Sequence, residues 1–252
     1  MNNKIAFITG ATSGIGATFA KVLASQKYDL VITGRREEKI QAFAAELRSK
    51  NNIKVEVIIA ELANVKDIDM LVEKITNIKN LEILINNAGF AKKGSRFYEE
   101  NITVYEDMLK VHALATIKLT QAALPTMVTN NIGSIINVSS IMSFFPCARQ
   151  SIYVATKAFI SLFTESIALE LKGTGVRVQA LCPGLTFSDL HERIGVDVEK
   201  LAKKRVWLWQ SPMHSKVVVD KSFKYLAKGK IICVPGFFNK VIITLHYLRR
   251  LF

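Results

Sequence analysis

The sequence predicts an α/β fold, a doubly wound parallel sheet of about seven strands with helices on both faces, in a single domain spanning residues 1–252. Three observations support this fold class. Short apolar runs alternate with amphipathic helical segments, which is the order that builds a parallel sheet. A glycine-rich turn joins the first apolar run to the first helical segment. The chain has 252 residues, 50% of them hydrophobic, so it can bury one large core.

The predicted strands are short apolar runs bounded by turn residues. They cover residues 4–9, 28–33, 53–59, 82–86, 132–138, 176–181 and 231–234. Apolar side chains recur at helical spacing in residues 17–27, 98–130 and 152–171, and again in residues 237–252 at the end of the chain. The sequence shows no linker, repeat or low-complexity segment, which favours one domain over two.

The turn after the first strand reads Thr9-Gly-Ala-Thr-Ser-Gly-Ile-Gly16. Gly10 suits a tight turn with positive φ, Gly14 lets the backbone approach a pyrophosphate, and Gly16 permits close packing of helix on strand. The N-terminus of the following helix offers unpaired N–H groups to phosphates. The spacing differs from the commoner G-x-G-x-x-G, but the strand, turn and helix context predicts a dinucleotide site. Its expected residues are Gly10, Thr12, Ser13, Gly14, Ile15 and Gly16.

Two arginines, Arg35 and Arg36, follow the second strand, and the first carboxylate comes only at Glu37. An acidic residue at this strand end binds the ribose 2′-hydroxyl of NAD, whereas an arginine accommodates a 2′-phosphate. A guanidinium also makes a bidentate, permanently charged contact with phosphate. The sequence therefore favours NADP(H). The alternative, that an arginine is only the solvated start of the next helix, is expected for one of the pair and not for both.

Tyr153 and Lys157 are four residues apart within 152–171, so a helix there places both side chains on one face. A nearby ammonium favours the phenolate, which makes the tyrosine a usable acid or base at neutral pH. Ser140 follows the fifth strand, and the carboxyl ends of such strands carry the active sites of open α/β sheets. We therefore predict that Tyr153 exchanges a proton with a substrate oxygen that Ser140 holds.

These motifs together resemble those of the short-chain dehydrogenase/reductase family over nearly the whole chain. The match includes the T-G-x-x-x-G-x-G turn, the segment Asn86-Asn-Ala-Gly89, the Ser140, Tyr153 and Lys157 set, and Pro183-Gly184 after the sixth strand. The resemblance implies a Rossmann-like fold and the transfer of a hydride between a nicotinamide and a carbonyl or alcohol carbon. It also implies that Lys157 lowers the pKa of the tyrosine and anchors the nicotinamide ribose.

Further cofactor contacts follow from the resemblance, position by position. Ser188 stands where the family usually has a threonine, and Glu61 stands where it has an aspartate. The expected contacts are Ile15 and Thr186 at the nicotinamide, Glu61 and Leu62 beside the adenine, Asn87, Ala88 and Gly89 on the adenosine side, and Pro183, Gly184 and Ser188 after the sixth strand.

The chain departs from the family at His112, where an asparagine usually links the lysine to solvent through a water. An imidazole both donates and accepts, so His112 either keeps this relay and titrates near pH 6.5 or is a packed, hydrogen-bonded histidine without a chemical part. We expect the second. The departure keeps a rival function open, that of a cofactor-binding regulatory or membrane-associated protein with little turnover.

The substrate lobe is expected in residues 188–215, between the sixth strand and the last long helix. Few charges and many apolar side chains predict an apolar carbonyl substrate, such as a 3-oxoacyl compound or a steroid-like ketone. The alternative is that Trp207 and Trp209 only cover the core and do not line a pocket. The apolar residues of the expected pocket are Leu190, Ile194, Val206, Trp207, Leu208, Trp209 and Met213, with Phe90, Met142, Phe144 and Phe145 from neighbouring loops.

Composition excludes several other classes of protein. The first predicted strand begins at residue 4 and no apolar run reaches 18 residues, so we expect neither a signal peptide nor a spanning helix. The chain has three cysteines, an odd number that cannot all form disulfide pairs, and their spacing is not that of metal ligands. They are Cys147, Cys182 and Cys233. We therefore expect reduced thiols, no metal site and a cytoplasmic protein.

Positive charge concentrates in the last fifth of the chain. Residues 201–252 hold eleven Lys and Arg and one acid, so this segment carries +10 of the formal net charge of +13. Such asymmetry suggests an anionic partner, although a solvated basic face with no role is equally compatible. No aromatic stripe or nucleic-acid module accompanies it, so we expect no nucleic-acid binding.

Two helices have apolar surface that needs a partner. The segment 152–171 is apolar on more than one face, and the family resemblance implies that it pairs with its copy in a homodimer or homotetramer. The segment 237–252 predicts a C-terminal amphipathic helix that either packs in the core or a dimer, or lies at a membrane surface; packing is favoured. Its expected apolar face is Phe238, Val241, Ile242, Leu245, Leu248 and Phe252, with Lys240 and Arg250 opposite.

Overall fold

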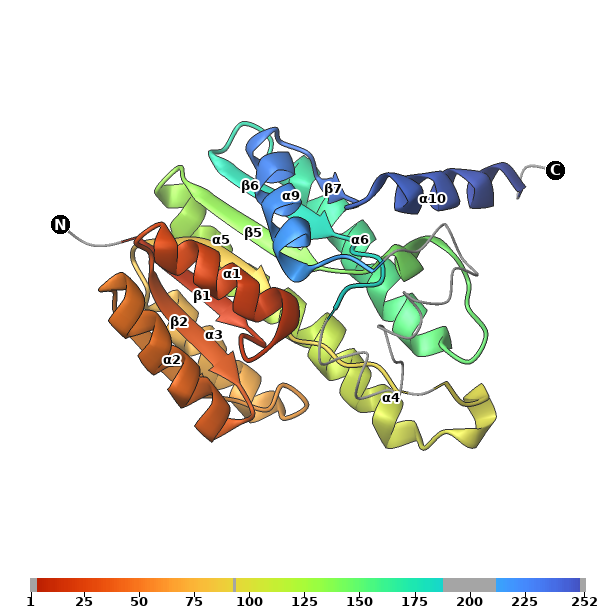
Figure 1. The fold of residues 1–252 in the computed structure, drawn as a ribbon, viewed down its shortest axis with the longest axis horizontal. Helices are drawn as coiled ribbons and strands as arrows, with labels where there is room; N and C mark the ends of the chain where they lie inside the picture. The colour runs from red at the N-terminus through yellow and green to blue at the C-terminus, as the bar shows by residue number, and fades with distance from the viewer. Residues whose placement is uncertain (1–3, 93, 188–211, 250–252) are drawn as a thin grey trace.

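The computed structural model describes residues 4–92, 94–187 and 212–249, and it confirms the predicted doubly wound α/β fold (Figure 1). The strands form one seven-stranded parallel sheet in the order β3-β2-β1-β4-β5-β6-β7. Each strand lies within two residues of its predicted range. The strands are β1 (Ile5–Thr9), β2 (Asp29–Gly34), β3 (Val55–Ile59), β4 (Leu81–Asn86), β5 (Gly133–Val138), β6 (Val176–Leu181) and β7 (Ile232–Cys233).

Helices connect the strands and cover both faces of the sheet. They are α1 (Gly14–Ser25), α2 (Glu37–Asn51), α3 (Val65–Thr76), α4 (Ile102–Leu109), α5 (Ala115–Thr129), α6 (Ser151–Glu170), α9 (Ser215–Ala227) and α10 (Phe237–Arg249). Two 3-10 turns, η1 (Phe97–Glu99) and η3 (Ile141–Phe144), lie in the loops. The first helix therefore begins at Gly14, before the predicted Ala17.

The predicted continuous helix over 98–130 is wrong. Helix α4 begins only after Asn101, whose side chain accepts a hydrogen bond from the Thr103 amide and so caps the helix. A π-helical turn, η2 (Lys110–Leu114), then separates α4 from α5. The hydroxyl of Thr116, in the first turn of α5, donates to the backbone carbonyl of His112 within η2 at 2.7 Å. Such turns often occur at functional sites, and here the turn carries the residue that departs from the family.

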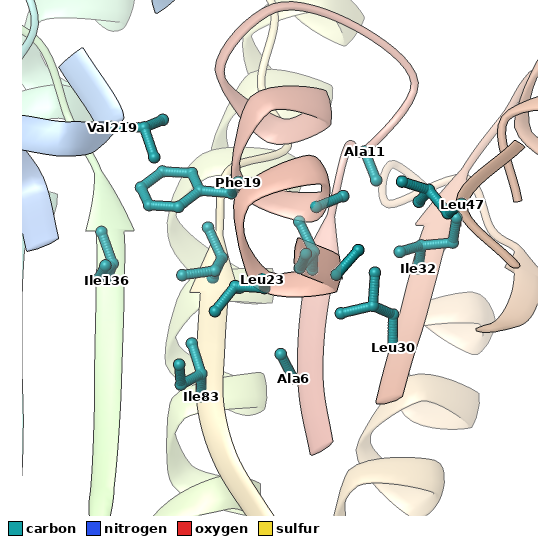
Figure 2. Packing of buried hydrophobic residues seen from close by; sticks show 14 of the residues in the cluster. Ala6, Ala11, Phe19, Leu23, Leu30, Ile32, Leu47, Ile83, Ile136 and Val219 are labelled. Carbon is teal, nitrogen blue, oxygen red and sulfur yellow. The ribbon is translucent and has the colours of Figure 1, made fainter. Parts of the chain in front are cut away.

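The two faces of the sheet bury separate apolar clusters, because successive strand residues point to opposite sides. On β1, Ala6 and Ile8 pack against α1, α2 and α9, whereas Phe7 packs with the helices of the opposite face, α3 and α5. Figure 2 shows the first cluster, in which Phe19 of α1 lies close to Val219 of α9. Helices thus cover both faces of the sheet, and because all strands run parallel their carboxyl ends meet at one edge.

Helix α6 is the one described helix that is long and apolar enough, by length and composition, to cross a membrane. The sequence expectation of no spanning helix rested on uninterrupted apolar runs, and α6 is interrupted by polar residues. It packs along β5 and β6 and buries Lys157, Ser161 and Thr164 on that side. We therefore assign α6 to the layer that covers the sheet.

Candidate active site

A cavity of about 490 Å³ opens at the carboxyl edge of the sheet. It extends from the turn after β1 to the loop after β6. Most of the predicted site residues line it; Gly16 lies outside the lining, and Ser188 lies outside the described residues. The predicted residues in the lining are Gly10, Thr12, Ser13, Gly14, Ile15, Arg35, Arg36, Glu61, Leu62, Asn87, Ala88, Gly89, Ser140, Tyr153, Lys157, Pro183, Gly184 and Thr186.

The glycine turn has the geometry that its residues predicted. Gly10 and Gly14 adopt positive φ angles of 66° and 56°, which favour glycine. A Cβ atom on Gly16 would lie 2.4 Å from both the Gly10 carbonyl oxygen and Asn87 Nδ2. Gly16 therefore serves the close packing of helix and turn, and the N-terminus of α1 faces the cavity through Gly14 and Ile15.

A hydrogen-bond cluster ties this turn to the loop after β4. The side chain of Asn87 donates to the carbonyls of Thr9 at 2.9 Å and Gly10 at 3.0 Å. In return, the hydroxyl oxygen of Thr9 accepts from the backbone N–H groups of Asn87 at 2.9 Å and Ala88 at 3.0 Å. The supporting role of Thr9 was not predicted. Its position directly before Gly10 in the motif was the available signal.

The two arginines after β2 lie at the same end of the cavity but have different partners. Arg35 donates to the carboxylate of Glu61 at 2.9 Å, and both side chains are about half exposed. Arg36 donates to the hydroxyl of Thr12 at 2.9 Å and lies 3.5 Å from that of Ser13. Arg36 is therefore held over the turn, whereas the charge of Arg35 is balanced by the residue expected beside the adenine.

Ser140, Tyr153 and Lys157 converge on one side of the cavity. Lys157 lies one turn after Tyr153 on α6, with its Nζ 5.8 Å from the centre of the tyrosine ring. The ammonium donates to the carbonyl of Val138 at 2.9 Å. Ser140 begins η3, where its hydroxyl oxygen accepts from the Met142 amide at 3.1 Å. The predicted catalytic set is thus assembled from β5, η3 and α6.

Burial is the largest influence on the acid–base groups. It raises the pKa of Tyr153 above its ordinary value, and a hydrogen bond with Ser140 acts in the opposite direction. Burial lowers the pKa of Lys157 to about 8. The expected lowering of the tyrosine pKa by Lys157 does not appear in this structure, where burial and Ser140 set the shift. A raised pKa keeps the phenol protonated at neutral pH, which suits a proton donor.

His112 is fully buried, and both of its ring nitrogens are engaged. Its Nε2 accepts from the backbone N–H of Phe90 at 3.0 Å, so Nδ1 carries the proton and donates to the Thr156 hydroxyl at 2.9 Å. That hydroxyl donates to the carbonyl of Tyr153 at 2.8 Å. Burial, followed by the charge of Lys157, holds the pKa of His112 well below its ordinary value. The packed, hydrogen-bonded histidine is confirmed, and the lowered pKa argues against a titration near pH 6.5.

The expected substrate wall is confirmed in part. Phe90 and Met142 line the cavity, together with the unpredicted apolar residues Ala91, Val111, Ile141 and Leu185. Phe144 and Phe145 were expected there and instead pack in a third apolar cluster with Ile243 of α10. Phe144 ends η3 and Phe145 directly follows it, with its ring 5.4 Å from that of His246 on α10.

Most of the predicted substrate lobe lies outside the described residues, including Leu190, Ile194, Val206, Trp207, Leu208 and Trp209. Met213 is described and sits in a short parallel bridge with Thr186. Its backbone N–H donates to the carbonyl of Leu185 at 2.9 Å, and its carbonyl accepts from Phe187 at 3.0 Å. Met213 therefore fastens the far end of the lobe to the loop after β6.

The three cysteines are free thiols in different surroundings. Cys182 and Cys233 are buried, and burial raises the pKa of both, that of Cys233 to about 12. Cys147 is partly exposed in the loop between η3 and α6. In the part of the chain that the structure describes, no three His, Cys, Asp or Glu side chains are grouped to hold a metal ion.

Comparison with known proteins agrees with the site. Residues 4–199 match the short chain dehydrogenase family. An uncharacterized oxidoreductase of Staphylococcus saprophyticus is 32% identical over 224 residues, which cover 86% of this chain and 95% of that protein.

Two solved structures are also similar. A short-chain dehydrogenase from Sphingobium yanoikuyae in complex with NADPH has a TM-score of 0.86 and 29% identity, covering 98% of this chain and 93% of that one. A bulky-bulky ketone specific alcohol dehydrogenase from Comamonas testosteroni has a TM-score of 0.81 and 26% identity, covering 99% and 95%. The chain therefore belongs to the short-chain dehydrogenase/reductase family, whose members are oxidoreductases that use NAD(P)(H).

Proposed function

We propose that this protein is an NADP(H)-dependent oxidoreductase that interconverts a carbonyl and an alcohol on an apolar substrate, such as a 3-oxoacyl compound or a steroid-like ketone. The observation that carries the proposal is one cavity that joins the glycine turn and the two arginines to Ser140, Tyr153 and Lys157. A dinucleotide fits this shape. Its phosphates would meet the N-terminus of α1, and its ribose would meet the buried ammonium of Lys157.

The protein's own groups account for the proton side of the reaction. NADPH held by Gly14, Arg36 and Lys157 would supply the hydride to the carbonyl carbon. Ser140 orients the carbonyl oxygen, and Tyr153 gives its phenolic proton to that oxygen, so that one hydride and one proton convert the carbonyl to an alcohol. With its pKa raised by burial, the phenol of Tyr153 is protonated at neutral pH and can act as the proton donor. Oxidation of an alcohol runs through the same groups in reverse.

The preference for NADP(H) is supported by Arg36, which is held over the turn by Thr12 and Ser13. This position suits a 2′-phosphate on the adenosine ribose. The similar short-chain dehydrogenase from Sphingobium yanoikuyae is in complex with NADPH. The apolar wall formed by Phe90, Met142 and Leu185 supports an apolar carbonyl compound, and the similar Comamonas enzyme is specific for bulky-bulky ketones.

We expect the protein to oxidise NADPH in the presence of apolar ketones and to bind NADPH well above NADH. A lost charged contact to the 2′-phosphate costs on the order of 1–3 kcal/mol, so the two affinities should differ by roughly tenfold or more. Fluorescence titration with both cofactors measures the preference. Absorbance at the nicotinamide band, with a panel of 3-oxoacyl and steroid ketones, measures turnover.

Matched variants sharpen this test. Arg36→Ala should weaken NADPH binding and leave NADH binding nearly unchanged, whereas Lys66→Ala removes an exposed cation of α3 and should change neither. Equal affinity of the wild type for both cofactors would refute the preference. Tight NADPH binding without turnover on any ketone would favour the rival function, that of a cofactor-binding protein with little turnover. The basic C-terminal segment is the feature that supports this rival.

We further propose that the protein forms a homodimer or homotetramer through α6. Leu162 and Leu169 of this helix are 68% and 60% exposed. Phe159 and Phe163 stack beside them, with ring centres 5.7 Å apart. Light scattering at micromolar concentration should give at least twice the 28.1 kDa chain mass. Leu162→Glu should lower that mass, and Leu109→Glu, a matched change on α4, should not; a wild type that scatters as a single chain contradicts the proposal.

A further inference from the structure

The apolar stripe of α10 faces away from the rest of the molecule. Helix α10 runs out from β7 past the body of the protein (Figure 1). Phe237, Phe238, Leu245 and Leu248 are 73%, 47%, 53% and 49% exposed. At helical spacing these four residues share one side with the half-buried Val241. We call Phe237, Phe238, Val241, Leu245 and Leu248 the outer stripe.

The opposite side of α10 makes the contacts that attach it. Asn239 is buried, donates to the carbonyl of Pro235 at 2.6 Å and abuts Gly184. Ile243 packs in the third apolar cluster, and the His246 ring lies 5.4 Å from that of Phe145. The side of α10 that carries Asn239, Ile243 and His246 therefore packs against the rest of the protein and fixes the orientation of the helix. Packing of the predicted apolar face into the core of its own chain is wrong for Phe238, Leu245 and Leu248, which are exposed, whereas Val241 and Ile242 are partly buried.

Positive charge is concentrated in the part of the chain that carries the outer stripe. Among the described residues from 212 to 249, six lysines accompany a single acid, Asp220, which pairs with Lys216 at 3.0 Å. The other lysines of this region are Lys221, Lys224, Lys228, Lys230 and Lys240. An uncompensated basic surface beside exposed aromatic and leucine side chains is typical of a helix that lies at an anionic membrane surface.

A groove beside α10 repeats this combination of groups. It has a volume of about 530 Å³, a floor made of Phe144, Ile232, Val234 and Ile243, and a rim that includes Lys228, Lys230 and Lys240. The ammonium of Lys240 donates to the hydroxyl of Tyr225 at 2.8 Å and lies 5.0 Å from the centre of its ring. The apolar floor suits the acyl chain of an anionic lipid, and the cationic rim suits its phosphate.

Charge also decides between a lipid surface and a second copy of the chain. In a two-fold interface the same patch faces itself. An interface built on α10 would bring the rim lysines of both copies together, and like charges at close range disfavour that arrangement. An anionic bilayer, by contrast, offers an apolar region to the stripe and negative headgroups to the lysines.

We propose that the outer stripe of α10 and the lysine-rimmed groove beside it form a docking surface for anionic phospholipid bilayers. The stripe enters the headgroup region, and Lys228, Lys230 and Lys240 contact phosphates. The protein is then a peripheral membrane protein. This attachment is independent of the proposed reaction, because it uses no residue of the catalytic set.

Sedimentation with vesicles tests the proposal on the full chain. The wild type should pellet with vesicles of phosphatidylcholine containing phosphatidylglycerol, and much less with phosphatidylcholine alone. Binding should weaken with added salt, since exposed charges are screened within about 10 Å at 0.1 M. Leu245→Glu should reduce binding by about tenfold or more, because a carboxylate on the stripe opposes insertion and repels the lipid. Lys228→Ala with Lys230→Ala should reduce binding by a similar factor.

Matched controls change the same chemistry elsewhere. Leu109→Glu on α4 alters a leucine of similar exposure, and Lys54→Ala with Lys66→Ala removes two exposed cations. These variants should pellet like the wild type, and circular dichroism should show that every variant is folded. Pelleting that ignores vesicle charge, or variants of the stripe and groove that bind like the wild type, would overturn the proposal. So would a Leu245→Glu variant whose only change is a smaller particle in light scattering, because a second copy would then cover the stripe.

Discussion

Tyr153→Phe should abolish turnover and leave NADPH binding intact. The substitution removes the phenolic proton and keeps the ring, which lies edge-on to His112 with centres 5.9 Å apart. Loss of a general acid costs on the order of 10²–10⁴-fold in rate. The ketone assay measures kcat, and fluorescence titration measures NADPH affinity. The loss should appear in kcat, because the interaction is made only in the transition state.

Tyr105→Phe is the matched control for this experiment. Its hydroxyl donates to the carbonyl of Phe97 at 3.3 Å, and Tyr105 is not part of the described cavity lining, so activity should stay at the wild-type level. If Tyr153→Phe kept more than a few per cent of the rate, the assigned proton donor would be wrong. A simultaneous loss of NADPH affinity would indicate that the hydroxyl also supports the cofactor site.

Lys157→Met should abolish activity. It should also remove the pH-dependent destabilisation that the buried ammonium causes in the folded chain. Burial lowers the pKa of Lys157 from 10.5 to about 8 in the folded chain. Below pH 8 the ammonium is charged in both states and destabilises the folded one. Between about pH 8 and 10.5 the folded lysine is neutral while the unfolded one still binds a proton, so stability rises with pH in this window. The methionine variant has no such titration.

The measured quantity is the free energy of unfolding in urea, wild type minus variant, at several pH values. This difference should rise by about 3 kcal/mol from below pH 8 to above pH 10.5, since one pKa unit corresponds to about 1.4 kcal/mol. Groups whose pKa does not depend on Lys157 cancel in this difference. Lys66→Met, which removes an exposed lysine, should give a flat difference. A flat difference for Lys157→Met as well would mean that its ammonium is not desolvated as the structure shows.

The sequence predicted the parts of the site that depend on local spacing. The glycine turn and the four-residue separation of Tyr153 and Lys157 place their groups through backbone geometry alone, so a strand–turn–helix pattern suffices. The ends of the parallel strands then bring Arg36 and Ser140 to the same edge. For this reason, the lining of the cavity agrees closely with the predicted residues.

The features that the sequence missed depend on contacts between distant segments. The tautomer of His112 is set by hydrogen bonds with Phe90 and Thr156, which lie 22 and 44 residues away in the chain. The direction of the Tyr153 pKa shift follows from burial, which no spacing reveals. Phe144 and Phe145 pack with Ile243 of α10 and not in the expected pocket. The sequence pattern does not show this contact between distant segments, and so it also does not show which side of α10 is exposed.

The unequal surroundings of the three thiols make the unmodified chain a ready substrate for site-selective labelling. Cys182 and Cys233 are buried with raised pKa values, so a maleimide dye reacts with them slowly, whereas Cys147 is accessible. The carbonyl of Cys147 accepts from the Gln150 amide at 3.2 Å, and Gln150 forms part of the cavity wall. A fluorophore on Cys147 therefore sits one turn from the site and reports its occupancy without any engineered cysteine.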